Sequence, residues 1–214
     1  SCYIAAALSE QAARYPTPLV ATCHVIPNGS DTEPDASAPS AGMGPLLAFD
    51  VAVVGAVGAH KGLGHLLETI AVAKPGLKVV VLGYVDGQLT PGWHVADRLW
   101  VHGAFEPSQL RALLRHYGVR RVWFPAGQPE SFSYALSDVW QAGWPVLVPD
   151  HGALGERVRE HGRGQVYDPA LPPAELVARI EQALANPPPG PTGQPEPSVA
   201  DMAARLQAHY RMTH

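Results

Sequence analysis

Short apolar runs alternate with segments of helical periodicity through the middle of the chain. Six runs are predominantly apolar and end near glycine, proline or a polar residue, namely 47–54, 77–82, 98–101, 121–124, 145–148 and 165–167. Apolar residues recur at helical spacing over 63–73, 107–117, 132–142, 156–160 and 174–185. Strands that are apolar on both faces are typical of a parallel sheet covered by helices. The pattern predicts an α/β fold: a doubly wound parallel sheet of about six strands with helices on both faces.

Two stretches that are poor in apolar residues flank this region. Residues 28–45 are rich in Gly, Ser, Pro and Asp, and residues 187–197 contain six prolines. Both are expected to be linkers or long loops. We therefore divide the chain into residues 1–45, a domain over 46–186, and a Pro-rich linker with a helix over 187–214.

The segment before the first linker is too short to complete a domain. We expect a helix over 5–15 and one strand over 18–26. The C-terminal piece is expected to be a lone helix over 199–212. We expect both terminal segments to be parts of a larger structure.

Composition excludes several classes of protein. With 15 Lys+Arg and a formal net charge of −4 in 214 residues, the chain is not expected to bind nucleic acid in general. No apolar run approaches the roughly 18 residues that span a bilayer, and no signal peptide opens the sequence. Two cysteines without a CxxC pair favour a reducing, cytoplasmic compartment.

A glycine-rich turn follows the first strand of the predicted domain. Ligands of open α/β sheets bind beyond the carboxyl ends of the strands, where this turn lies. Residues 55–62 read G-A-V-G-A-H-K-G, and the ammonium of Lys61 would suit a phosphate. The turn is not a P-loop, since Gly62 follows Lys61, and Gly83-Tyr84 ends the second strand where a dinucleotide site needs an acid. The alternative is a solvated lysine in a turn.

Two carboxylates flank the predicted start of a helix after the fourth strand. The free amides of 132–134 would point out of the helix and could receive a diphosphate. Glu130 precedes them and Asp138 follows eight residues later, so both suit hydroxyl groups on either side of an anion. The alternative is that Glu130 is a favourable helix-start charge and Asp138 a surface acid.

A third segment, 150–157, follows the fifth strand. Its glycines suggest a loop packed tightly near the same cleft, whereas Glu156 and Arg157 are expected to be ordinary solvated charges.

Ten histidines without an HExxH motif predict no zinc site, and no GxSxG elbow is present. The five tryptophans are expected in the core or in cleft walls.

The ordered motifs resemble the C-terminal, donor-binding half of group 1 retaining glycosyltransferases, which have the GT-B fold. The resemblance covers roughly 47–168. The matching segments, in family order, are G-x-x-G-x-H-K-G at 55–62, V-V-V-L-G-Y at 79–84, V-H-G-A-F at 101–105, P-E-S-F-S-Y-A-L-S-D at 129–138, A-G-W-P-V-L-V at 142–148 and G-A-L-G-E-R-V at 152–158. The family's E-x7-E motif falls on Glu130 and Asp138.

This resemblance implies a Rossmann-like lobe that binds a UDP-, GDP- or dTDP-sugar without a metal or another cofactor. Glu130 would hold donor-sugar hydroxyls, Asp138 the ribose, and Lys61 a phosphate, with Glu130 and Lys61 as the catalytic pair. The donor-binding set it implies is Gly55, Gly58, Lys61, Gly83, Gly103, Glu130, Phe132, Ser133, Tyr134 and Asp138. The implied partner is an N-terminal lobe that binds a glycan or lipid acceptor, and the full enzyme could associate peripherally with a membrane.

Three functions follow from the resemblance. The first is retaining transfer of a sugar to a glycan or lipid, in surface-polysaccharide or glycolipid assembly, by an enzyme of which this chain alone is poorly active. The second is a degenerate nucleotide-binding or assembly module, because Ala56 and Ala126 stand where the family often has Arg and Ser, and Asp138 replaces Glu. The third, a sugar-nucleotide epimerase or phosphorylase, is disfavoured by the motif spanning Glu130 and Asp138.

Overall fold

The computed structural model describes residues 48–87, 89–186 and 198–213, together with Ala6, Leu8 and Glu10. The first linker and the strand expected over 18–26 lie outside the described residues, as does residue range 187–197. Of the helix expected over 5–15, three single positions are described, and all three are helical.

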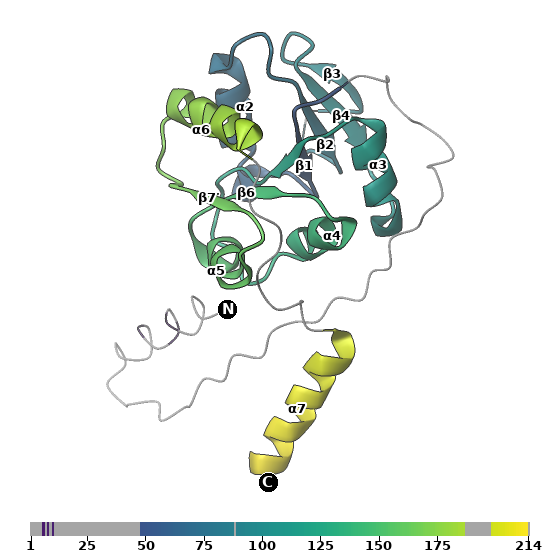
Figure 1. Cartoon of the computed structure of the whole chain (residues 1–214), viewed down its shortest axis with the longest axis vertical. Helices are drawn as coiled ribbons and strands as arrows, with labels where there is room; N and C mark the ends of the chain where they lie inside the picture. Colours follow the sequence, from purple (N-terminus) through teal and green to yellow (C-terminus); the bar gives the residue numbers. More distant parts are fainter. Residues whose placement is uncertain are drawn as a thin grey trace.

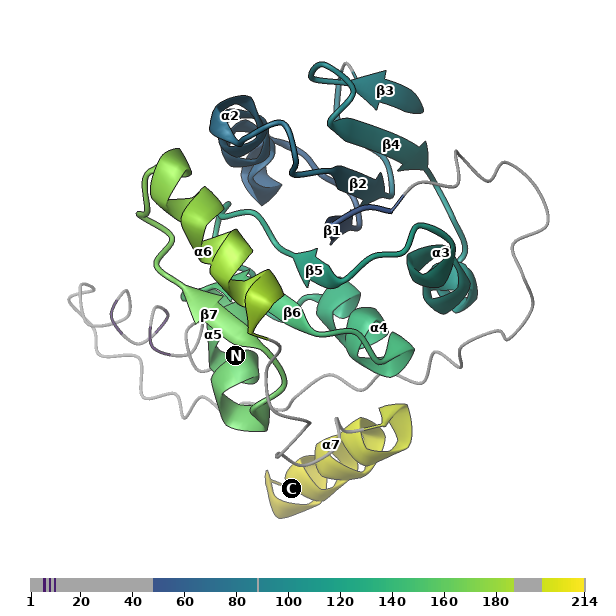
Figure 2. The same cartoon turned by 45° about the horizontal axis from the view of Figure 1, so that its top comes forward.

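Seven strands of the described chain form one sheet in the order β3-β4-β2-β1-β5-β6-β7 (Figures 1 and 2). They are β1 (Val51–Val54), β2 (Val79–Leu82), β3 (Gly92–His94), β4 (Leu99–Gly103), β5 (Arg121–Trp123), β6 (Val146–Pro149) and β7 (Gln165–Tyr167). All six predicted strands are present and run parallel to one another. The predicted sheet lacked β3, which runs antiparallel to β4 at one edge. It has only three half-buried residues, too few for a recognisable pattern.

Helices cover both faces of this sheet, as the pattern predicted. On one face lie α2 (Leu63–Val72) and α6 (Pro173–Ala185), packed against the side chains of Val51, Val53, Val79 and Val81. On the other lie α3 (Leu110–His116), α4 (Tyr134–Ala142) and α5 (Gly152–His161), over Ala52, Val54, Val80 and Leu82. Alternate residues of β1 and β2 therefore enter two separate apolar layers, which explains why neither strand shows polar alternation.

The starts of α4 and α5 differ from the predicted ones. Helix α4 begins at Tyr134 and not at 132, because Ser133 has a positive φ of 74° and lies outside the helix. Helix α5 begins at Gly152, four residues before the prediction. Its glycines lower helix propensity and hid the first turn in the sequence.

Buried aromatic and basic side chains join the layers. Trp123 and Trp140 lie in the core, and the other three tryptophans pack against it, as expected. Arg121 is only 2% exposed and donates hydrogen bonds to the carbonyl oxygens of Val146 and Ala183, at 3.3 and 2.6 Å. Burial lowers the pKa of its guanidinium to about 10. Arg121 thus ties β5 to β6 and to the end of α6.

The remaining helices are short, or lie outside the sheet domain. The 3-10 turns η1 (Ala59–Lys61) and η2 (Pro107–Gln109) precede α2 and α3. Helix α7 (Val199–Thr213) lies apart from the sheet in Figures 1 and 2.

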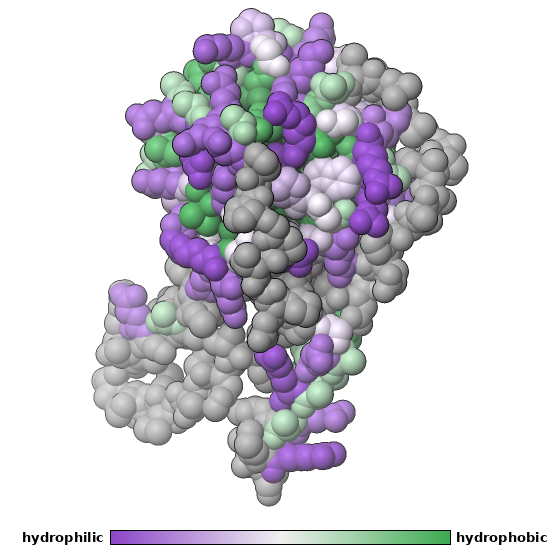
Figure 3. All heavy atoms as spheres, viewed as in Figure 1, coloured by the Kyte–Doolittle hydropathy of each residue, from purple (hydrophilic) through white to green (hydrophobic). Residues whose placement is uncertain are grey.

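Hydrophilic residues dominate the visible surface of the sheet domain, with apolar residues in smaller areas between them (Figure 3). Among the described residues, none of the helices has both the length and the apolar character to cross a bilayer.

Candidate functional site

A pocket opens beyond the carboxyl ends of β1 and β5. Its walls come from the end of β1 and the following turn, from the β5–α4 loop, and from the first residues of α4 and α5. The polar side chains among its lining residues are Lys61, Gln128, Glu130 and His151. The pocket therefore lies at the edge of the sheet where the sequence placed the ligand.

Lys61 and Glu130 meet in this pocket. The Lys61 Nζ and Glu130 Oε1 atoms are 3.8 Å apart, and the two side chains are 39% and 23% exposed. One residue lies in η1 and the other in the β5–α4 loop, 69 positions apart in the sequence. The structure thus brings together the two residues predicted as the catalytic pair, and leaves both accessible to a ligand.

Close backbone packing sets the position of Lys61. A Cβ atom added at Gly127 would lie 2.7 Å from the Gly62 nitrogen and 2.8 Å from the Lys61 carbonyl carbon. The Gln128 N–H donates a hydrogen bond to the His60 carbonyl oxygen at 2.7 Å. Only glycine at 127 allows this approach of the β5–α4 loop to η1. The sequence prediction did not include Gly127, which has no chemistry of its own.

His65 fixes the same loop from the side of α2. The Ala126 N–H donates to His65 Nδ1 at 3.0 Å. Burial of the ring lowers the pKa of His65 below its ordinary value, although Glu68 opposes the shift. The neutral ring keeps its Nδ1 lone pair for this bond, so His65 helps to position the loop. The described residues contain no cluster of three or more His, Cys, Asp or Glu that could hold a metal ion.

His151 brings a third ionisable group into the pocket. It immediately precedes α5, and the Ala153 N–H donates to the Glu130 carbonyl oxygen at 2.9 Å. A Cβ atom at Gly152 would lie 3.0 Å from the Glu130 nitrogen and oxygen. The start of α5 therefore packs directly on the backbone of Glu130. This confirms the prediction of tight packing near the cleft, but the side chain of His151 was not singled out.

Three of the glycines predicted to bind the donor have packing roles. Gly55 and Gly83 have positive φ values of 108° and 138°, and a Cβ at Gly83 would overlap the Gly55 carbonyl group. The Gly83 N–H donates to the Gly103 carbonyl oxygen at 2.9 Å. None of these three glycines is among the pocket-lining residues, nor is Gly58, which precedes η1. Their roles towards a donor stay predictions.

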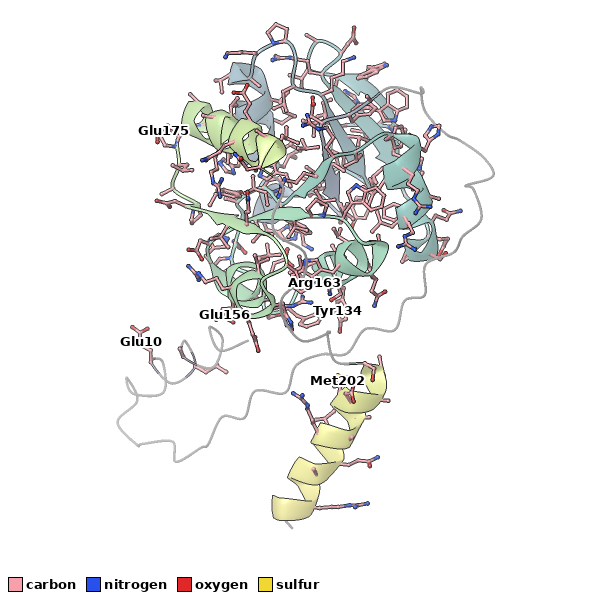
Figure 4. The ribbon with its side chains drawn as sticks, in the orientation of Figure 1. Glu10, Tyr134, Glu156, Arg163, Glu175 and Met202 are labelled. Atoms are coloured by element: carbon pink, nitrogen blue, oxygen red, sulfur yellow. The ribbon has the colours of Figure 1, made fainter. Side chains whose placement is uncertain are left out.

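Apart from Lys61 and Glu130, the other predicted donor-binding residues also lie outside the pocket lining. Phe132 and Ser133 belong to the turn before α4, and Ser133 is 8% exposed. Tyr134 begins α4 and is 59% exposed, while Asp138 lies inside the helix. Figure 4 shows Tyr134 with Glu156 and Arg163 along the edge of the domain formed by α4 and α5. Of the first turn of α4, Ala135 alone reaches the pocket.

Arg157 is buried, so the expectation that it is a solvated charge was wrong. It is 8% exposed and donates to the carbonyl oxygens of Phe132 and Ser133, at 2.7 and 2.8 Å. It also donates to Ser137 Oγ at 2.7 Å, and its guanidinium carbon lies 4.0 Å from the centre of the Phe132 ring. Helix periodicity places Arg157 beside Leu154 and Val158, on the buried side of α5, which is the signal that could have revealed it.

We expect Arg157→Met to lower the free energy of unfolding by about 2–4 kcal/mol, because two carbonyl oxygens and a buried hydroxyl lose their donor. Urea unfolding followed by circular dichroism measures the change. Arg159→Met is the matched control, since Arg159 is 59% exposed and forms an ion pair with Asp150. It should cost at most about 1 kcal/mol. Equal effects of the two substitutions would show that Arg157 has no special role.

The fold and the pocket define a Rossmann-like α/β lobe with a pocket at the carboxyl edge of its sheet. The family model for glycosyl transferases group 1 matches residues 48–192. The chain therefore belongs to the group 1 glycosyltransferase family, as its motifs predicted. None of the curated proteins matches the sequence.

Solved structures with the GT-B fold resemble the chain. Sucrose-phosphate synthase from Thermosynechococcus elongatus aligns over 89% of this chain and 52% of its own, with 18% identity and a TM-score of 0.60. HepE from Anabaena, in complex with UDP and glucose, aligns over 74% and 48%, with 17% identity and a TM-score of 0.52. AviGT4, a glycosyltransferase involved in avilamycin A biosynthesis, aligns over 78% and 52%, with 20% identity and a TM-score of 0.50. The chain thus spans about half the length of these structures.

Proposed function

We propose that this chain is the donor-binding lobe of a retaining glycosyltransferase that uses a nucleotide-diphosphate sugar. The observation that carries the proposal is the meeting of Lys61 and Glu130 in a pocket at the carboxyl edge of a parallel sheet. A cation and a carboxylate side by side suit a ligand whose anionic phosphates adjoin neutral hydroxyls. The HepE structure, which contains UDP and glucose, supports the same class of ligand.

Each residue has a defined task in this proposal. The ammonium of Lys61 binds the diphosphate and stabilises the charge that develops as the nucleotide departs. The carboxylate of Glu130 accepts hydrogen bonds from the donor-sugar hydroxyls and so orients the sugar. Asp138 is proposed to accept from the ribose, and the backbone at the start of α4 to contact the diphosphate.

The acceptor belongs to a second lobe. Since the chain spans about half the length of its structural neighbours, we propose that an N-terminal lobe binds a glycan or lipid and completes the active site. The proposed setting is surface-polysaccharide or glycolipid assembly in the cytoplasm. This chain alone should bind nucleotide but transfer sugar poorly.

Isothermal titration calorimetry of the 214-residue chain with UDP, GDP and dTDP, each beside its monophosphate, tests the proposal. We expect one diphosphate to bind at least about tenfold more tightly than its monophosphate, because the second phosphate adds charge beside Lys61. Equal affinity for a diphosphate and its monophosphate would show that the pocket does not recognise the second phosphate.

A degenerate module of the same fold is the second candidate. Ala56 lines the pocket and supplies no charge, which favours weakened donor binding. This candidate predicts that none of the three diphosphates binds at millimolar concentration. The same titrations therefore separate the two functions.

A further inference from the structure

His151 faces the donor pocket with a group that can change its charge. Among the residues that line the pocket, Lys61 has the single permanent positive charge, and His151 is the other basic side chain. The position of His151 is well defined, because it directly precedes Gly152, which packs on the backbone of Glu130. His151 therefore lines the same pocket as the ammonium and the carboxylate that meet there.

The charges around His151 nearly balance in the free protein. Lys61 and Glu130 pair at 3.8 Å across the pocket, and Arg159 of α5 pairs with Asp150 at the end of β6. Burial lowers the pKa of the His151 imidazole below its ordinary value, and the carboxylates of Asp150 and Glu130 oppose this shift. The ring is therefore neutral near pH 7 when the pocket contains no anion.

We infer that His151 is a second, titratable cation of the donor pocket, which takes up a proton from solvent when a nucleotide diphosphate enters and then binds a phosphate oxygen together with Lys61. This inference rests on the proposed function. A diphosphate adds at least two negative charges beside the ring, and nearby negative charge favours the imidazolium. Binding of the donor is then coupled to binding of a proton, and departure of the nucleotide to its release.

The direction of the pH dependence follows from this coupling. The ligand raises the pKa of His151, so affinity increases as the pH falls through the pKa of the complex and levels off below the pKa of the free protein. A rise of one unit on binding corresponds to about a tenfold gain in affinity across this interval. Neutral substitutions at 151 should remove the gain.

Calorimetry between pH 5.5 and 8.5 tests the inference, with the tightest-binding probe among UDP-glucose, GDP-mannose and dTDP-glucose. These diphosphate diesters have no phosphate group that titrates in this range. Titrations at one pH in buffers of different ionisation enthalpy also count the protons taken up. We compare wild type with His151→Gln, with His151→Lys, and with His94→Gln as a matched control, since His94 lies on β3 outside the pocket.

We expect wild type and His94→Gln to take up a fraction of a proton and to bind several-fold more tightly at pH 5.5 than at pH 8.5, because the full tenfold gain is reached only below the pKa of the free ring. His151→Gln should take up none and change less than about twofold over this range. His151→Lys should bind at pH 8.5 at least as tightly as wild type binds at pH 5.5, which a merely structural role would not produce.

Two results overturn the inference in distinguishable ways. If the probe binds and His151→Gln retains the proton uptake of wild type, His151 is not the titrating group although the donor pocket stands. If wild type binds none of the three probes at millimolar concentration, both the proposed function and the inference fail.

Discussion

Lys61→Ala should weaken binding of the preferred nucleoside diphosphate by about 10- to 100-fold. An ammonium about 4 Å from a phosphate oxygen is worth about 4 kcal/mol at an effective dielectric of about 20. Lys61 is 39% exposed, so solvent screening reduces this to about 1.4–2.7 kcal/mol, which corresponds to the stated loss. Calorimetry at one pH and one ionic strength measures the change.

Lys74→Ala is the matched control, because the chain has only three lysines and Lys74 follows the opposite end of α2. It removes the same charge from the protein but leaves the pocket intact. Lys61→Arg keeps a cation and should recover most of the affinity. If Lys61→Ala and Lys74→Ala bind the diphosphate equally, the assignment of Lys61 to a phosphate is wrong.

Gly83→Ala should destabilise the domain by about 4 kcal/mol or more, the largest effect on folding that we expect. Its Cβ would lie 2.7 Å from the Gly55 carbonyl carbon and closer still to the oxygen, where both neighbours are backbone atoms of packed strands. The φ of 138° adds strain for a residue with a side chain. Such clashes belong to the few mechanisms that produce effects of this size.

Gly64→Ala provides the control for Gly83→Ala. Gly64 lies in α2, and a Cβ there has no neighbour within 4 Å. Alanine in a helix is more favourable than glycine by up to about 1 kcal/mol, so this variant should unfold at a higher urea concentration than wild type. A Gly83→Ala protein as stable as wild type would contradict the packing described for the ends of β1 and β2.

The strands and most helices could be predicted because burial on both faces leaves uninterrupted apolar runs such as Val79–Leu82. Strand β3 could not, since Gly92–His94 is half-buried and its pairing with β4 depends on a neighbour in space. The first turn of α5 was missed because Gly152 and Gly155 are present for close approach to other backbone. Local propensity does not report such contacts.

The site residues that could be predicted are those with a charged side chain at the end of a predicted strand. Lys61 and Glu130 both follow strand ends, and parallel strands direct those ends to one edge of the sheet. Gly127 could not be predicted from the sequence, because it matters only for lacking a side chain where the loop packs beside Lys61. Arg157 was misjudged because a charge suggests solvent, whereas carbonyl oxygens of the turn before α4 pair with it inside the protein.

The most direct measurement of the central claim is a crystal structure of the chain with its tightest-binding nucleotide-diphosphate sugar. The account predicts a phosphate oxygen within about 3.2 Å of Lys61 Nζ and a sugar hydroxyl at a similar distance from the Glu130 carboxylate, in place of their mutual contact. A nucleotide bound elsewhere on the domain, with Lys61 and Glu130 still facing only each other, would contradict it.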